Sequence, residues 1–104
     1  MIEHLVVFNL KPDITATDRE WLFNQIRTIL GRIPTVRSLR LAQAYSVLDA
    51  AGKPKRPVEF EWALSMDFDD LAGLEIYSRD ADHRALATEI QNRVSSLKIM
   101  DFES

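Results

Sequence analysis

Apolar residues occupy both sets of alternate positions along residues 2–10, IEHLVVFNL, near the start of the chain. β-branched and aromatic side chains are frequent, and the run is too short for a long helix, so it predicts a strand. Successive strand residues point to opposite faces, which places Leu5 and Val7 on one side. The other side carries Ile2, His4, Val6, Phe8 and Leu10. Since both sides are apolar, we expect both faces of this strand to be covered.

A helical pattern follows the turn-forming KPD segment. Thr17 and Glu20 have the spacing of a capping box, which predicts the start of a helix. Apolar residues then recur at helical intervals at Leu22, Ile26, Ile29, Leu30 and Ile33. Gly31 and Pro34 mark the end of this amphipathic helix.

Two further strands are predicted in the middle of the chain. Residues 37–48 alternate Leu39, Leu41 and Tyr45 against Arg40, Ala42 and Ala44. Residues 58–68 alternate more regularly and have one bulky face, made by Val58, Phe60, Trp62, Leu64, Met66 and Phe68. The intervening DAAGKPKRP is the longest loop signal, and its short basic cluster is interpreted as a solvated turn.

The last part of the chain predicts two helices and a strand. A short helix over residues 69–78 is followed by a break and then by a longer helix with an apolar stripe at Leu86, Ile90 and Val94. His83 precedes Leu86 by three positions and therefore shares this stripe. The ending LKIMDFE predicts a fourth strand.

The order of these elements is that of an α+β domain with the ferredoxin-like βαββαβ arrangement, formed by residues 1–104 as one domain. We expect a four-stranded antiparallel sheet whose bulkier face is covered by the helices. The remaining face carries Leu5, Val7, Ala42, Ala44, Ala63 and Ser65. Because this face is small and apolar, a second copy closing over it is the expected cover, and we predict a homodimer.

Composition narrows the function classes. The 104 residues are 46% hydrophobic and 28% charged, as in an ordinary globular domain, and the formal net charge of -3 disfavours a nucleic-acid partner. No cysteine is present, which excludes disulfides and thiolate chemistry. The chain has no apolar run of membrane-spanning length and no signal-peptide pattern, so we expect a cytoplasmic protein without a membrane partner.

Candidate chemistry lies in EIYSRDADHRAL, which places Tyr77 and His83 six positions apart. On one continuous helix the two side chains would point about 120° apart and would not share a site. If Asp80 or Asp82 instead caps a new helix, the chain turns between them and both rings can face one cavity.

The chain also resembles a known family, the stress-responsive dimeric A/B barrel (Dabb) domain. The similarity is carried by IEHLVVFNLKPDIT, IPTV, DFDDLAGLEIYSRDADH and the closing MDFE, and it spans essentially the whole chain. The family implies a dimeric α/β barrel of two ferredoxin-like units. Many members are stress-associated proteins without a known reaction, and some assemble further. A plant branch, similar to olivetolic acid cyclase, closes linear polyketide intermediates.

In that branch a strand histidine, a helix tyrosine and a later histidine face one pocket, and the matching residues are His4, Tyr77 and His83. The resemblance implies aldol chemistry with a histidine as general base. The branch carries another histidine where this chain has Trp62. This difference changes the predicted shape and polarity of the pocket, so the cyclase substrate is not carried over.

Each candidate also has a structural interpretation. A helix N-terminus favours neutral His83, whereas Asp80 and Asp82 favour its protonated form, and either form exchanges protons near neutral pH. His83 can equally be a capping or core residue, His4 a buried hydrogen-bonding residue and Tyr77 a core residue. The apolar set that either lines a cavity or simply fills the core is Phe8, Leu22, Phe23, Ile26, Trp62, Leu64 and Leu86.

Two function classes therefore remain open. One is a cyclase or isomerase that acts on a small apolar carbonyl compound without a cofactor, with His83 as base, helped by Tyr77 and His4. The other is a noncatalytic, stress-associated ligand-binding or oligomeric protein. With only two histidines and no HxH or HExxH spacing, the sequence predicts no metal site.

Overall fold

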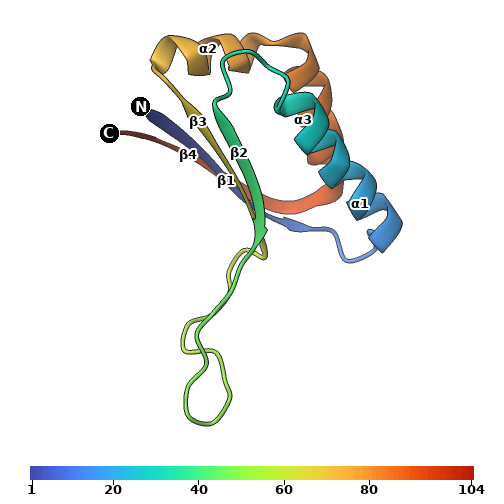
Figure 1. Cartoon of the computed structure of the whole chain (residues 1–104). Coiled ribbons are helices and arrows are strands. Elements are labelled where there is room, and N and C mark those ends of the chain that lie inside the picture. Colours follow the sequence, from blue (N-terminus) through green and yellow to red (C-terminus); the bar gives the residue numbers. More distant parts are fainter.

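The protein is described by a computed structural model that covers residues 1–104. The elements, shown in Figure 1, are β1 (Ile2–Leu10), α1 (Ala16–Gln25), the π-helical turn η1 (Ile26–Leu30), β2 (Ser38–Gln43), β3 (Trp62–Phe68), α2 (Leu71–Arg79), α3 (Ala81–Arg93) and β4 (Val94–Glu103).

The strands form one antiparallel sheet in the order β2-β3-β1-β4, and the helices cover one of its faces (Figure 1). This confirms the predicted ferredoxin-like fold. β1 lies between β3 and β4, and the register places His4 opposite Met66 on one side and Asp101 on the other. The central strand therefore carries a histidine whose neighbour on β4 is a carboxylate.

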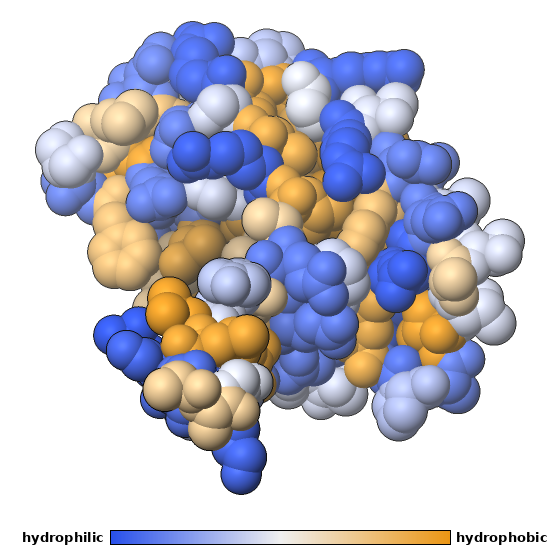
Figure 2. Space-filling view, turned by 60° about the horizontal axis from the view of Figure 1, so that its bottom comes forward, coloured by the Kyte–Doolittle hydropathy of each residue, from blue (hydrophilic) through white to orange (hydrophobic).

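Both middle strands are shorter than the alternation predicted. β2 ends at Gln43 and β3 begins at Trp62, and residues 44–61 form an arm that extends away from the sheet (Figure 1). No helix reaches this part of the chain, and Tyr45 is 83% exposed. The arm turns where the Asp49 carboxylate accepts hydrogen bonds from two backbone N–H groups and Gly52 has φ of 78°. Hydrophobic surface stays exposed at the end from which the arm projects (Figure 2).

The start of α1 also differs from the prediction. Its cap is Thr15, whose hydroxyl oxygen accepts the Asp18 N–H at 3.1 Å, so the Thr17 and Glu20 capping box is wrong. Thr15 has the extended backbone that a capping residue needs, whereas Thr17 already lies inside the helix. After η1 the chain passes Gly31, where a Cβ would lie 2.5 Å from the Arg27 carbonyl oxygen. Only glycine fits this close backbone approach.

The core lies between the helices and the bulkier sheet face, as predicted. Its most buried side chains are Phe8, Leu22, Ile26, Leu30, Leu64, Met66 and Phe68. The predicted apolar stripe of α3 ends earlier than expected, because Val94 has extended backbone and is the first residue of β4. None of the helices combines the length and apolar character needed to cross a bilayer.

The opposite sheet face has no helix over it (Figure 1). The register places Met100 beside Leu5 and Phe102 beside Glu3 on this face. Met100 is 43% exposed and Phe102 49%, so β4 adds two large apolar side chains to the set expected from the sequence. The face is more apolar than the sequence analysis suggested.

Candidate functional site

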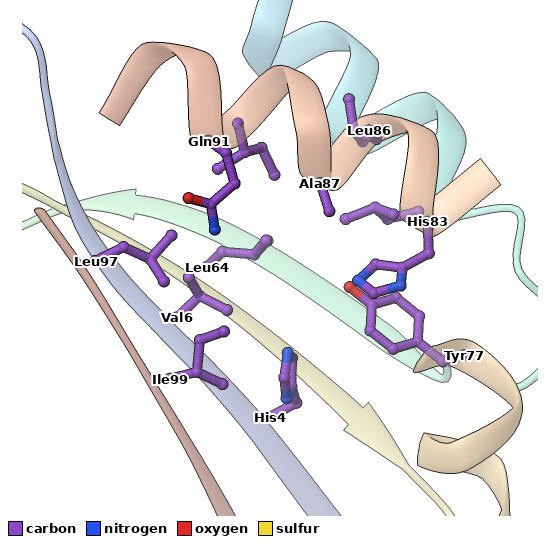
Figure 3. A pocket seen from close by; sticks show the side chains of 12 residues that line it. His4, Val6, Leu64, Tyr77, His83, Leu86, Ala87, Gln91, Leu97 and Ile99 are labelled. Atoms are coloured by element: carbon purple, nitrogen blue, oxygen red, sulfur yellow. The ribbon is translucent and has the colours of Figure 1, made fainter. Parts of the chain in front are cut away.

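His4, Tyr77 and His83 come together from three elements. The ring centroids of Tyr77 and His83 are 4.1 Å apart, and those of His4 and Tyr77 are 5.6 Å apart. Figure 3 shows His4 standing up from β1 toward the two rings, which come from α2 and α3. The convergence expected from the sequence is therefore present, while the chemical roles of the residues stay a prediction.

A helix break at Asp80 makes this convergence possible. Asp80 ends α2 and caps α3, with its carboxylate accepting hydrogen bonds from the N–H groups of Asp82 and His83 at 2.9 and 3.2 Å. Its extended backbone turns the chain between the two helices. Of the two aspartates considered from the sequence, Asp80 is therefore the cap.

His4 has a carboxylate partner that the sequence analysis missed. Its Nδ1 lies 2.5 Å from Oδ1 of Asp101, and the side chains are 12% and 45% exposed, respectively. Since a carboxylate only accepts hydrogen bonds, Nδ1 carries the proton and a neutral His4 keeps its lone pair on Nε2. The closing MDFE segment contained this residue, but only the pairing of β4 with β1 brings it to His4.

His83 and Tyr77 are both held in their neutral forms. Burial lowers the pKa of His83 and the nearby His4 acts in the same direction, while the Ser78 carbonyl and Asp80 oppose them. Its Nδ1 is buried without a hydrogen-bond partner. Burial, followed by the negative charge of Asp101, raises the pKa of the Tyr77 hydroxyl. Tyr77 therefore remains a hydrogen-bond donor, and burial decides the balance at His83 that the sequence left open.

These rings border a cavity of about 70 Å³ between α3 and the sheet (Figure 3). Its polar lining residues are His4, Tyr77, His83 and Gln91. The apolar ones are Val6, Leu30, Leu64, Leu86, Ala87, Ile90, Leu97 and Ile99. One water molecule needs roughly 10–15 Å³ of cavity volume measured in this way. The cavity therefore has room for about five waters or one small organic molecule.

The family is settled by comparison of the sequence with protein-family models. Residues 2–104 match the model described as the Stress responsive A/B Barrel Domain, Dabb. The chain belongs to the Dabb family. Among curated proteins, no sequence matches it.

Solved structures show the same fold for this Dabb domain. A Dabb family protein from Mesorhizobium loti is 24% identical with a TM-score of 0.82, over 99% of this chain and 95% of its own. A dimeric ferredoxin-like protein of unknown function from Thermobifida fusca is 17% identical with a TM-score of 0.79, over 99% and 90%. Hydroxynitrile lyase from Passiflora edulis is 12% identical with a TM-score of 0.81, over 97% and 90%. At these identities the likeness shows the fold alone.

Only some of the apolar residues predicted to line the pocket do so in the structure of this Dabb domain. Leu64 and Leu86 do line the cavity. The residues that lie in other parts of the layer are Phe8, Leu22, Phe23, Ile26 and Trp62. Phe23 makes edge contacts with Phe8 and Trp62, with centroids 6.3 and 4.9 Å apart. Trp62 is not part of the cavity wall.

Two polar residues of the site, Asp101 and Gln91, were not identified from the sequence, and neither were most of the apolar lining residues. Asp101 needed the strand register, and Gln91 reads as an ordinary exposed helix residue. The only available signal for Gln91 was its spacing of eight from His83, which places both on one face of α3. As for metals, the structure has no group of three or more His, Cys, Asp or Glu side chains arranged to hold an ion.

Proposed function

We propose that this Dabb domain removes a proton from the carbon next to the carbonyl of a small neutral compound, as a cofactor-independent isomerase or cyclase. The observation that carries the proposal is the contact between the His4 imidazole and the Asp101 carboxylate. The same imidazole lines the cavity beside Tyr77. A histidine oriented by a carboxylate is a recurrent arrangement for a general base.

His4 is the better base of the two histidines. When its Nε2 takes a proton, the resulting imidazolium lies against the Asp101 carboxylate, which stabilises the new charge. His83 has no such contact, and its lowered pKa makes it the weaker proton acceptor. The sequence led us to expect His83 as the base, whereas the proposal assigns this role to His4.

Tyr77 and His83 complete the proposed site. As the proton moves from carbon to Nε2 of His4, the electron pair of the broken C–H bond shifts toward the carbonyl oxygen and forms an enolate. The Tyr77 hydroxyl stays protonated and donates a hydrogen bond to this oxygen. Return of the proton to a different atom gives an isomer. In the alternative, the enolate carbon attacks a second carbonyl and closes a ring, and the alkoxide formed from that carbonyl takes the proton back from His4. Neutral His83 packs against Tyr77 and helps to position it.

The test is exchange of ketone α-protons for deuterium, followed by NMR in D₂O with small ketones such as 2-butanone. This readout detects the proposed base before a natural substrate is known. His4→Gln is expected to slow protein-dependent exchange by about 10²- to 10⁴-fold. Asp101→Asn is also expected to slow protein-dependent exchange. Glu103→Gln is the control, because Glu103 lies two positions from Asp101 on the same strand. Full exchange by folded His4→Gln would refute the assignment.

A noncatalytic ligand-binding protein is the second candidate, and the small, mostly apolar cavity favours it. Eight of its lining residues are apolar and only four are polar. Under this alternative, ketones bind and perturb the NMR signals of cavity residues, yet no protein-dependent exchange occurs. The same NMR samples therefore separate the two candidates.

We also propose that the chain forms a homodimer through the open sheet face. Leu5, Val7, Met100 and Phe102 give this face an apolar surface, and several solved structures of this fold are described as dimeric. Light scattering at micromolar concentration is expected to give the mass of two chains. Val7→Lys should produce monomers, whereas Ile76→Lys, on an exposed part of α2, should not. A cytoplasmic location and a role in stress remain part of the proposal.

A further inference from the structure

The cavity under α3 has polar groups at two separated places. His83, Ala87 and Gln91 follow one another at intervals of four residues and so lie on one face of the helix. At 1.5 Å per residue, His83 and Gln91 are about 12 Å apart along its axis. Figure 3 shows the Gln91 amide directed toward the sheet, well away from the group formed by His4, Tyr77 and His83.

The stretch between these polar groups is apolar and open. Ala87 is the residue of α3 halfway between His83 and Gln91, and its small side chain leaves room beneath the helix. The facing strands contribute Val6, Leu97 and Ile99. A molecule lying along the cavity would therefore contact hydrocarbon in its middle and hydrogen-bonding groups toward its ends.

We propose that the ligand of this cavity is a neutral molecule with two oxygen functions, a carbonyl held at the His4 and Tyr77 end and a second oxygen bound by the Gln91 amide. A short hydrocarbon segment joins the two. The carbonyl end of this inference rests on the proposed function, whereas the Gln91 end rests on the shape and lining of the cavity.

We expect a neutral ligand because the cavity lining contains no lysine or arginine to pair with an anion. No lysine or arginine borders the cavity, so a carboxylate or phosphate entering it would lose water without gaining a counter-charge. Asp101, which contacts His4, adds a negative charge near one end. A carbonyl or hydroxyl oxygen, by contrast, matches the two N–H donors of the Gln91 amide.

Gln91 thereby acts as a specificity-determining residue. The Gln91 side chain is exposed, so water bonds its amide in the free protein, and a ligand with an apolar end displaces that water without replacing its hydrogen bond. For a single neutral hydrogen bond we expect a preference of about three- to tenfold.

The test uses two ketones of nearly equal shape, 2,6-heptanedione and 6-methyl-2-heptanone, in which a methyl group replaces the far carbonyl oxygen. Each is titrated into the full chain and followed by protein-observed NMR. The wild type is expected to bind the dione about three- to tenfold more tightly. Gln91→Leu, which keeps side-chain size and helix propensity, should remove or reverse this preference. Asn92→Leu, at the next position of α3, should retain it.

Each result decides the inference. Equal binding of the two ketones to the wild type, binding of neither, or an unchanged preference in Gln91→Leu would overturn it. Butyrate and inorganic phosphate should not compete, and displacement of the dione by either would contradict the neutral ligand. Failure of the proposed function is seen separately, because it abolishes α-proton exchange while leaving the dione preference intact. Conversely, exchange of 6-methyl-2-heptanone without any dione preference supports the base and rejects the role of Gln91.

Discussion

The layer between helices and sheet has a filled region and an open one. Around Phe8 and Phe23 large side chains meet edge to face and leave little space. Around His4 and Tyr77 the same sheet and the same layer of helices enclose a cavity of about 70 Å³. The difference lies in the side chains, because Ala87 faces the cavity where a larger residue would fill it. One fold thus provides a stabilising region and, beside it, a place for a ligand.

Leucine-to-alanine substitutions should give the largest difference in stability between the two regions. Leu22 is fully buried, so Leu22→Ala is expected to lower the free energy of unfolding by about 2–5 kcal/mol. Leu97 borders the open region and is only partly buried, so Leu97→Ala should cost less than about 2 kcal/mol. Urea unfolding followed by circular dichroism measures both. Equal losses would show that the open region is packed as tightly in solution as the filled one.

Removal of the Tyr77 hydroxyl should affect chemistry without affecting packing. Tyr77→Phe keeps the ring in its contacts with Phe68 and His83, so the urea midpoint should stay close to that of the wild type. Loss of the donor to the enolate oxygen is expected to slow α-proton exchange by about 10²- to 10³-fold. Tyr45→Phe, on the 83% exposed arm residue, is the matched control. Unchanged exchange in Tyr77→Phe would remove this residue from the mechanism.

Enlarging a side chain should have opposite consequences in the two regions. Leu22→Phe adds volume where none is free and should destabilise the fold by about 1–3 kcal/mol. Ala87→Leu adds volume to the cavity, so its stability should change by less than about 1 kcal/mol while ketone binding is lost. Urea unfolding and NMR titration provide the two readouts. Retained ketone binding in folded Ala87→Leu would place the ligand elsewhere.

The smallest expected effect is the pH dependence of stability contributed by His83. Its pKa is lowered in the folded chain, so below about pH 6.5 the unfolded chain binds more protons than the folded one. The free energy of unfolding should therefore fall as the pH drops from this value toward the lower folded-state pKa. His83→Gln is expected to show a weaker decrease between pH 7.5 and 5.5 in urea unfolding. A parallel decrease in both proteins would mean that burial does not hold His83 neutral.

Local patterns were enough to predict the fold. The two-residue period of β1 and β3 sorted side chains such as Val6 and Leu5 onto opposite faces, because a strand with a covered face tolerates no shift of one residue. The break at Asp80 was also visible in the sequence, since a short acidic side chain between two helical patterns is a typical cap. That break alone made the meeting of Tyr77 with His83 a reasonable hypothesis.

Other features depended on contacts between distant parts of the chain. Alternation continued past Gln43, but no helix covers the following residues, so they form the arm instead of more sheet. The same limit applies to the cavity, because sequence spacing does not reveal which large side chains meet and which leave space.

What the sequence by itself determined was the order of the elements, the two faces of the sheet and the helix break beside His83. Only the tertiary structure decided that Asp101 contacts His4, although 97 positions separate them along the chain. It also decided that Gln91 borders the same cavity as Tyr77. The physical reason is that strand and helix patterns arise from neighbours in sequence, whereas strand register and the side chains that meet across a layer are set by packing of the whole chain.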